Sequence, residues 1–398
     1  MIMDVAIVTN FCSALDSPTN SRFTYLAEML RKDHSVELVG SDFSHDSKTT
    51  RICDYSRFSY KVTLIHEPGY RRNISIKRFL SHRIWGKNVL TYFKNRKKPD
   101  VVYCAVPSLT AASLLGKYCN SNGIRFIIDI QDLWPEAFKM VFNIPVISGL
   151  LFFPFKITAD KAYSQADVIC AVSDSYAERA LRVNSKVDSA CVVYLGTDLS
   201  IFDASSGKKN CLPDNKRLRL CYCGSLSDSY DICCVIDALS IMGRNAPEFI
   251  VVGDGYLKKE FEKYAQEKSV DALFFGYRDY SEMCSILCSC DIAINPIRGK
   301  SAASIINKHA DYAAAGVPVV NTQESAEYRS LVDNYNMGFN CLNGDATDIA
   351  NRLNLLMTDS SLRSTMGSNA RRCAEERFDR RETYKKLVNC IVGLKERI

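Results

Sequence analysis

Two residues of opposite charge, Lys308 and Asp311, stand three positions apart in the segment 307–322, which is otherwise mostly small and apolar. On a helix this step rises about 4.5 Å and completes nearly one turn, so both side chains share a face. A lysine in a first helical turn can bind a phosphate oxygen, because free N–H groups and the helix dipole already favour an anion there. A carboxylate one turn later can accept hydrogen bonds from two neighbouring hydroxyl groups. The spacing suits a ligand that carries an anionic group beside two hydroxyl groups; the alternative is an exposed acid that pairs weakly with Lys308.

The rest of this segment has the composition of a scaffold. A helix that begins near Ser304–Asn307 would carry Ala313–Ala315, whose small side chains allow tight packing on a sheet. Gly316 suits the helix end, and Pro318 prevents the helix from continuing into the next strand.

Short apolar runs of strand-forming residues alternate with longer helical patterns along the whole chain. Strands that are apolar on both faces and separated by helices indicate parallel sheets. The predicted strands are too many for one doubly wound sheet. The polar segment 200–216 separates the strands into two groups. The sequence therefore predicts an α/β protein with two Rossmann-like domains, 1–199 and 217–375, joined by a linker at 200–216. A C-terminal helix, 376–398, is expected to pack back on the first domain.

Glycines mark the turns after several strands of the second predicted domain, namely Gly224, Gly253, Gly255 and Gly276. Ligands of open α/β sheets bind beyond the carboxyl ends of the strands, and glycine lets the backbone approach them closely. The turn GDGY does not match the GxGxxG fingerprint, and the turn after the first strand has no glycine at all. A dinucleotide-dependent oxidoreductase is therefore disfavoured.

The composition is that of a folded globular protein, with 47% hydrophobic and 24% charged residues. No apolar stretch reaches the roughly 18–20 residues that span a bilayer, and the amino terminus lacks the pattern of an export signal. The 17 cysteines lie mainly in apolar runs, which favours a reduced, cytoplasmic compartment. No paired CxxC units accompany Cys284, Cys288 and Cys290, so a zinc site is disfavoured.

Residues 71–98 contain ten Lys or Arg and no Asp or Glu, interleaved with apolar and aromatic residues at roughly helical spacing. Such a segment suits an anionic membrane surface. Binding to nucleic acid is a weaker alternative. The simplest alternative is a solvated helix that packs on the protein through its apolar side.

The turns, in this order, resemble glycosyltransferase family 4, which has the GT-B architecture of two Rossmann-like domains facing across a cleft. Four segments resemble motifs of its second domain: CGSL, VVGDGYLKKEFEKYA, SCDIAINPI and NKHADYAAAGVPVV. In the first domain, YLGTDLSIF resembles the family's NGVDxxxF strand end. IDIQDLWPEAF resembles the DLWPE loop of the subgroup that builds bacterial O-antigens and capsules, and the likeness extends to N-acetylfucosaminyltransferases.

The resemblance implies a transferase that moves an N-acetylated or deoxy hexose from a UDP-sugar to a polyprenyl-diphosphate-linked saccharide. It implies retention of configuration, with the departing phosphate taking the acceptor proton. It also implies that the reaction uses neither a metal ion nor a cofactor. The expected partners are the nucleotide-sugar, the lipid-linked acceptor and an anionic membrane surface bound through 71–98, with no nucleic acid. The expected location is cytoplasmic, peripheral on the inner face of the bacterial inner membrane, with the apolar segment 146–155 assisting.

Resemblance and residue pattern together mark three sets of candidates. The catalytic set is Gln131, Asp132 and Lys308. The donor-binding set is Gly224, Ser225, Gly253, Gly255, Tyr277, Arg298, Ser304, Ile305, Asn307, Lys308 and Asp311. The acceptor-binding set is Asn20, Gln131, Asp132, Trp134 and Glu136. Capping of the following helix is an equal alternative for Asp132 and Glu136, as core packing is for Trp134.

The sequence departs from the family pattern at several of these positions. Asp311 replaces a Glu, Ala303 stands where the family has a second Glu, and Gln131 replaces a histidine. Ser225 and Asp231 stand where the family has Arg and Lys, so Lys308, Arg298 and Lys300 are left as the candidate cations. These departures motivate a rival interpretation, a non-catalytic GT-B subunit that binds nucleotide-sugar. A nucleotide-sugar epimerase of the same architecture is a further alternative.

Overall fold

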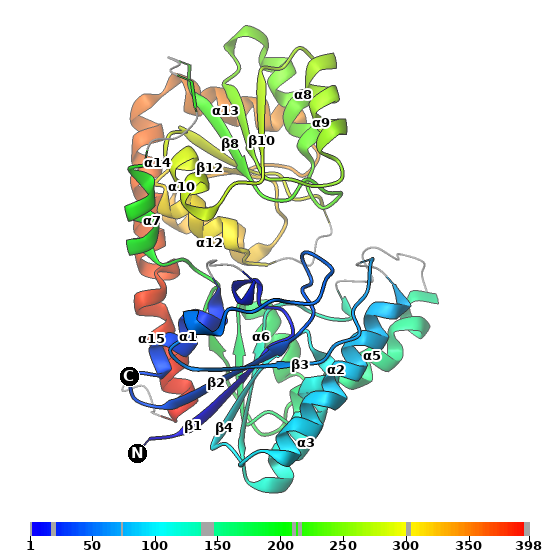
Figure 1. The fold of residues 1–398 in the computed structure, drawn as a ribbon. Coiled ribbons are helices and arrows are strands. Elements are labelled where there is room, and N and C mark those ends of the chain that lie inside the picture. The colour runs from blue at the N-terminus through cyan, green and yellow to red at the C-terminus, as the bar shows by residue number, and fades with distance from the viewer. Residues whose placement is uncertain are drawn as a thin grey trace. The chain divides into compact units, whose positions relative to one another are not determined.

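The computed structural model describes residues 2–16, 21–72, 75–136, 147–208, 212–213, 217–299 and 304–393, with the backbone alone for 147–151. The chain divides into two compact units (Figure 1). The first unit is Met1–Tyr194 with Glu382–Ile398, and the second is Leu195–Arg381.

The first unit is built on a seven-stranded parallel sheet of order β3-β2-β1-β4-β5-β6-β7. Strand β1, the third in this order, pairs on both sides, so that Val8 lies beside Val39 and Cys104. The middle strands are almost wholly buried, which explains why both faces are apolar in the sequence. The strands are β1 Asp4–Val8, β2 Ser35–Ser41, β3 Lys61–Ile65, β4 Val101–Val106, β5 Arg125–Ile130, β6 Val168–Ala171 and β7 Cys191–Val192.

Helices cover this sheet. They are α1 Arg22–Leu30, α2 Ile76–Asn95, α3 Leu109–Asn122, α5 Ile147–Ser164, α6 Asp174–Leu181 and α15 Arg380–Val392. Tyr384, Leu387 and Ile391 of α15 are fully buried in one core cluster with residues of β1, α1 and β4. Their spacing of three and four residues puts them on one helical face, so α15 closes the core of the first unit.

The second unit has a six-stranded parallel sheet of order β10-β9-β8-β11-β12-β13. Its strands are β8 Arg219–Cys223, β9 Glu248–Val252, β10 Ala272–Gly276, β11 Ile292–Asn295, β12 Val319–Asn321 and β13 Gly338–Asn340. Its helices are α7 Leu199–Ser206, α8 Ile232–Met242, α9 Lys258–Glu267, α10 Tyr280–Cys288, α11 Asn307–Ala314, α12 Ala326–Tyr335, α13 Ala346–Thr358 and α14 Ser360–Cys373. The prediction of an α/β protein with two parallel Rossmann-like sheets is confirmed.

The segment 200–216, predicted as a linker, begins with structure. Residues Leu199–Ser206 form α7, which belongs to the second unit. Asp198 caps this helix by accepting bonds from the backbone N–H groups of Ser200 and Ile201, and Leu199 and Phe202 are buried. A cap and two buried apolar side chains suffice to order a short helix against a neighbour, here α10.

The basic segment 71–98 is mostly helix α2, and its apolar residues divide into two groups. Trp85, Val89 and Phe93 are buried in the first unit, as the plain interpretation of a packed helix requires. Ile76, Leu80 and Ile84 remain exposed on a different face. Within the residues that the structure describes, no helix combines the length and hydropathy needed to cross a bilayer.

The cysteines in the described part of the chain are free thiols, and most are buried. Cys284 and Cys290 are among the buried ones, Cys284 on α10 and Cys290 just beyond it. Across the described ranges, no three His, Cys, Asp or Glu side chains gather in a way that could hold a metal ion.

Candidate functional site

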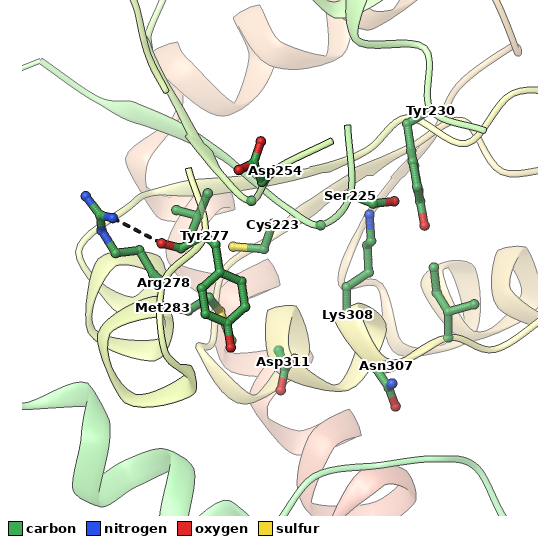
Figure 2. Close-up of a pocket in the computed structure, with 14 residues that line it drawn as sticks. Cys223, Ser225, Tyr230, Asp254, Tyr277, Arg278, Met283, Asn307, Lys308 and Asp311 are labelled. Carbon is green, nitrogen blue, oxygen red and sulfur yellow. Dashed lines mark hydrogen bonds between the residues drawn. The ribbon is translucent and has the colours of Figure 1, made fainter. Parts of the chain in front are cut away.

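A cavity of about 510 Å³ opens in the second unit, where the turns after β8, β9 and β10 meet the start of α11 (Figure 2). This is the carboxyl edge of the sheet, where open α/β sheets bind ligands. The residues that line it are Cys223, Gly224, Ser225, Tyr230, Val252, Gly253, Asp254, Tyr277, Arg278, Met283, Ile306, Asn307, Lys308 and Asp311.

Two glycines allow the turns to approach one another at this edge. Gly224 has φ +149, and a Cβ there would lie 2.7 Å from Lys308 Nζ. Gly253 has φ +139, and a Cβ there would lie 1.8 Å from the carbonyl oxygen of Gly224. Larger residues would therefore strain the backbone and displace the lysine. The glycines make room for the cation at the cavity wall.

Lys308 rises from the first turn of α11 toward Ser225 and Tyr230 (Figure 2). Its side chain is buried, and its Nζ has no hydrogen-bond partner among the described residues. It lies 4.2 Å from the ring centroid of Tyr222 and 3.8 Å from that of Tyr230. Burial lowers the pKa of Lys308 to about 7. A buried amine without an anionic partner is costly to charge, and a bound anion would relieve that cost.

Asp311 lies one turn further along α11 and is also buried in the cavity wall. Its Oδ1 accepts a hydrogen bond of 2.8 Å from the hydroxyl of Tyr280, which is itself 2.5 Å from Thr197 Oγ1. Burial raises the pKa of Asp311 to about 6, and the bond from Tyr280 opposes that rise. No ion pair joins Asp311 to Lys308 in the part of the chain described, and neither residue is exposed. The alternative of an exposed acid paired with Lys308 is therefore wrong.

The start of α11 is fixed by buried polar side chains from the ends of two strands. Gln323 Nε2 donates a 2.7 Å bond to the carbonyl oxygen of Ser304, and Asn295 Nδ2 donates a 3.1 Å bond to Gln323 Oε1. His309 Nδ1 accepts a 3.3 Å bond from the N–H of Ile306, and its ring stacks on Tyr328 at 3.4 Å. These contacts hold the turn from which Asn307 and Lys308 project.

The structure brings seven of the predicted donor-binding residues together at this cavity: Gly224, Ser225, Gly253, Tyr277, Asn307, Lys308 and Asp311. The others have different places. Ser304 and Ile305 are buried and do not line the cavity, and the Ser304 hydroxyl donates to Glu327 Oε2 at 3.0 Å. A Cβ on Gly255 would lie 2.1 Å from the carbonyl oxygen of Leu226, and Arg298 lies 3.8 Å from Asp231.

Several lining residues were not predicted from the sequence, among them Tyr230, Asp254, Arg278 and Met283. Asp254 could have been predicted, since it stands inside the GDGY turn after β9. Tyr230 could not, because its approach to Lys308 depends on how the loop after β8 folds. Lys300 and Ala303 lie outside the described residues.

The candidates in the first unit follow β5. Gln131 Nε2 donates a 2.9 Å bond to Asp129, whose two carboxylate oxygens are 2.9 and 3.0 Å from the guanidinium of Arg22. Asp132 accepts a 3.0 Å bond from the indole N–H of Trp134, and burial raises the pKa of Asp132. Asn20 lies outside the described residues.

Trp134 and Glu136 have partners within the first unit. The Trp134 ring is buried, lies parallel to the ring of His82 at 5.5 Å, and has Arg78 4.5 Å from its centroid. These contacts favour the core interpretation of Trp134. Glu136 pairs with Arg179 at 2.7 Å, and its role toward an acceptor stays a prediction.

Comparisons with known proteins give a family model and a similar curated protein. Residues 217–359 match the family model described as Glycosyl transferases group 1. A similar curated protein is the putative colanic acid biosynthesis glycosyl transferase WcaI of Escherichia coli (strain K12), 22% identical over 313 residues and 75% of each chain.

Two solved structures show the fold. Alr3699/HepE of Anabaena, in complex with UDP, superposes with a TM-score of 0.70 at 16% identity, over 99% of this chain and all of the other. Sucrose-phosphate synthase of Thermosynechococcus elongatus superposes with a TM-score of 0.73 at 13% identity, over 98% and 99% of the two chains. The two parallel-sheet units are those of the GT-B fold, as predicted.

Proposed function

We propose that this chain is a glycosyltransferase that binds a UDP-sugar in the cavity of the second unit. The observation that carries the proposal is the pair Lys308 and Asp311, both buried in one cavity wall, one turn apart and not paired with each other. The match of residues 217–359 to group 1 glycosyl transferases supports it, as does the presence of UDP in the HepE structure.

The proposed binding mode follows from the cavity wall. The diphosphate would lie at the start of α11, bound by Lys308 Nζ and by free backbone N–H groups of the first turn. The ribose hydroxyls would donate to Asp311, whose position Tyr280 fixes. Tyr277, largely exposed at the rim, offers a ring face to the base.

The proposed reaction breaks the bond between the sugar C1 and the diphosphate oxygen, with positive charge developing on the sugar. Charge on the departing diphosphate would be stabilised by Lys308 and the α11 N-terminus, which act where negative charge develops. In a retaining transfer, the departing phosphate oxygen takes the acceptor proton, so a protein base is not required. Gln131 and Asp132 would then position the acceptor rather than exchange a proton, and no metal ion or cofactor would take part.

The proposed acceptor is a polyprenyl-diphosphate-linked saccharide of bacterial O-antigen or capsule synthesis, and the sugar an N-acetylated or deoxy hexose. The similarity to WcaI, a putative glycosyl transferase of colanic acid biosynthesis, supports a cell-surface polysaccharide. Cytoplasmic synthesis at the inner face of the inner membrane would suit the basic α2, whose Ile76, Leu80 and Ile84 are exposed.

The test is calorimetric binding of UDP-, GDP- and TDP-sugars, followed by UDP release when a lipid-diphosphate saccharide is added. Binding of UDP-sugars with acceptor-dependent release supports the proposal. Binding without release for any acceptor would support the rival, a non-catalytic subunit, which the Ser225 and Asp231 substitutions motivate. The Asp311→Ala variant should lose at least tenfold in UDP affinity with the fold intact, whereas unchanged affinity would contradict the ribose assignment.

A further inference from the structure

A second cavity, of about 800 Å³, lies in the first unit among α2, α3 and α5. Helix α3 packs against both of the others, and the three run side by side in Figure 1. The lining is mainly aliphatic and aromatic: Ser75, Ile76, Phe79, Leu80, Arg83, Lys87, Leu109, Thr110, Ser113, Leu114, Phe152, Pro154, Phe155 and Thr158. A cavity of this size and character suits a small apolar ligand.

The apolar lining includes side chains that the fold leaves in water. Ile76 is 79% exposed and Leu80 is 52% exposed, one helical turn apart on α2. Phe79 and Phe155 form an aromatic wall, with ring centroids 4.6 Å apart. Exposed apolar residues gathered at a cavity mark a binding site more often than scattered ones do. A hydrocarbon chain would bury these surfaces.

The charged residues of this lining are all cationic. Arg83 and Lys87, again one turn apart, are exposed on α2, and the lining contains no Asp or Glu. Within the described residues, neither Arg83 nor Lys87 forms an ion pair. The hydrocarbon chain is therefore expected to belong to an anion.

A third cavity, of about 650 Å³, lies at the start of α2 and is strongly basic. Lys48, Arg71, Arg72 and Lys77 line it, without any acid, beside Phe43, Pro68, Gly69, Tyr70 and Ser75. Ser75, the N-cap of α2, lines both this cavity and the apolar one. The basic cavity and the apolar cavity thus meet at one residue. Four cations at one end of a hydrocarbon-sized cavity match a headgroup with more than one negative charge.

We propose that the two cavities form one site for a lipid diphosphate, with its prenyl chain among α2, α3 and α5 and its diphosphate among Lys48, Arg71, Arg72 and Lys77. This inference rests on the proposed function, because it locates the lipid end of the acceptor on the first unit. The lining residues of both cavities fit one lipid molecule whose hydrocarbon chain enters the apolar cavity. They fit the flat surface of a bilayer less well.

The experiment titrates the full chain by calorimetry with farnesyl diphosphate, kept below its aggregation concentration, and with its two pieces, farnesol and inorganic diphosphate. Saturating UDP is present throughout, so that the cavity of the second unit does not take up diphosphate. Farnesyl diphosphate is expected to bind at least tenfold more tightly than either piece, because the two cavities would be filled by one molecule.

Two variants separate the two halves of the site. Leu80→Gln should weaken farnesyl diphosphate and farnesol at least fivefold and leave inorganic diphosphate unchanged. Arg72→Glu should weaken farnesyl diphosphate and inorganic diphosphate at least tenfold and leave farnesol unchanged. The matched controls are Leu355→Gln, an exposed leucine of α13, and Lys94→Glu, an exposed cation of α2 outside both linings. Both controls should bind all three probes as the unchanged chain does.

Three results would overturn the inference. Farnesyl diphosphate could bind no better than its pieces, or both variants could leave its affinity unchanged. Alternatively, Leu80→Gln and Arg72→Glu could weaken the binding of phosphatidylglycerol–phosphatidylethanolamine vesicles while farnesyl diphosphate does not compete with the vesicles, which would assign both residues to membrane contact and not to a lipid-diphosphate site. UDP binding, measured separately, reports on the proposed function. Intact UDP binding with no lipid diphosphate binding would therefore refute this inference alone.

Discussion

Lys308 and Asp311 lie on one helical face, yet burial rather than mutual attraction governs their charge. Burial lowers the pKa of Lys308 to about 7 and raises the pKa of Asp311 to about 6. Both groups therefore titrate near neutral pH in the empty cavity. Sequence reasoning placed them together because helical spacing depends on the chain alone. It could not give their burial, which depends on Tyr222, Tyr230 and Tyr280 arriving from other elements.

UDP affinity should accordingly have a maximum between about pH 6 and pH 7. Above about pH 7 the amine of Lys308 is neutral in the empty cavity, so diphosphate binding must take up a proton and weakens by up to about tenfold per pH unit. Below about pH 6 the protonated Asp311 no longer accepts from both ribose hydroxyls. Plotted against pH, UDP affinity should therefore have an acid limb below this maximum and an alkaline limb above it. Calorimetry across pH 5 to about 9 measures both limbs.

The Lys308→Arg variant separates the two causes, because a guanidinium stays charged throughout this range. The alkaline limb should disappear and the acid limb remain. Lys259→Arg, at an exposed position of α9, is the control and should keep both limbs. An alkaline limb that survives in Lys308→Arg would show that another group titrates there.

Replacing Lys308 by methionine should stabilise the protein while removing nucleotide binding. The native pKa of about 7 lies below the ordinary value of 10.5, so the unfolded chain holds a proton more tightly. The resulting cost is complete below about pH 7 and vanishes as pH rises through about 10.5, amounting to roughly 3–5 kcal/mol at its largest. Thermal unfolding of Lys308→Met against the unchanged chain at pH 6.5 and at pH 10.5 measures the effect. A variant of equal or lower stability at pH 6.5 would contradict this account.

At the scale of elements, α11 depends on a polar support built from strand ends. Asn295 ends β11 and Asn321 ends β12, and Gln323 follows two residues later. Gln323 is buried and joins Asn295 to the carbonyl oxygen of Ser304. The support fixes the N-terminal end of α11, and with it the direction in which Lys308 leaves the helix.

The Gln323→Ala variant tests this support. It should cost about 1–3 kcal/mol of stability, because the carbonyl oxygen of Ser304 loses the bond from Gln323 and the buried amide of Asn295 loses one of its partners. It should also weaken UDP several-fold, although Gln323 does not line the cavity. Chemical unfolding and calorimetry measure the two effects. Gln266→Ala, on the exposed face of α9, is the control. Lost stability with unchanged UDP affinity would limit Gln323 to a structural role.

The elements also show how far sequence reasoning extends. The strands were predictable, because buried parallel strands are apolar on both faces and leave continuous runs in the sequence. Helix α7 was not, because its two buried side chains, Leu199 and Phe202, make too weak a pattern among polar neighbours. For α2 the helix was predictable, but not which apolar residues face inward. Trp85 packs inside while Leu80 faces the solvent, and the neighbouring α3 decides this.

At the scale of the whole molecule, the second unit is one continuous stretch, whereas the first unit is completed by Glu382–Ile398. Each unit has its own buried core, so each is expected to unfold with its own stability. The sequence predicted both sheets and a returning C-terminal helix. The boundaries between the two units lie between Tyr194 and Leu195 and between Arg381 and Glu382. These boundaries are defined by packing alone.

The Leu387→Ala variant should destabilise the first unit selectively. Leu387 is fully buried in that core, so its truncation should cost about 2–5 kcal/mol. Calorimetric scanning should show the transition of the first unit at a lower temperature, with the UDP-stabilised transition of the second unit unchanged. Lys386→Ala, an exposed neighbour on α15, should leave both transitions in place. Equal shifts of both transitions would show that the two units unfold as one.

The return of α15 to the first core also bears on how the chain folds during synthesis. Domains generally fold as units while the chain emerges, the N-terminal one first. Here the first seven strands leave the ribosome early, but Tyr384, Leu387 and Ile391 of their core emerge only after the whole second unit. The half of the protein that is translated first is therefore the half that is finished last, and it waits with apolar surface uncovered on β1, α1 and β4. A chaperone that binds nascent chains would find its longest-lived target there.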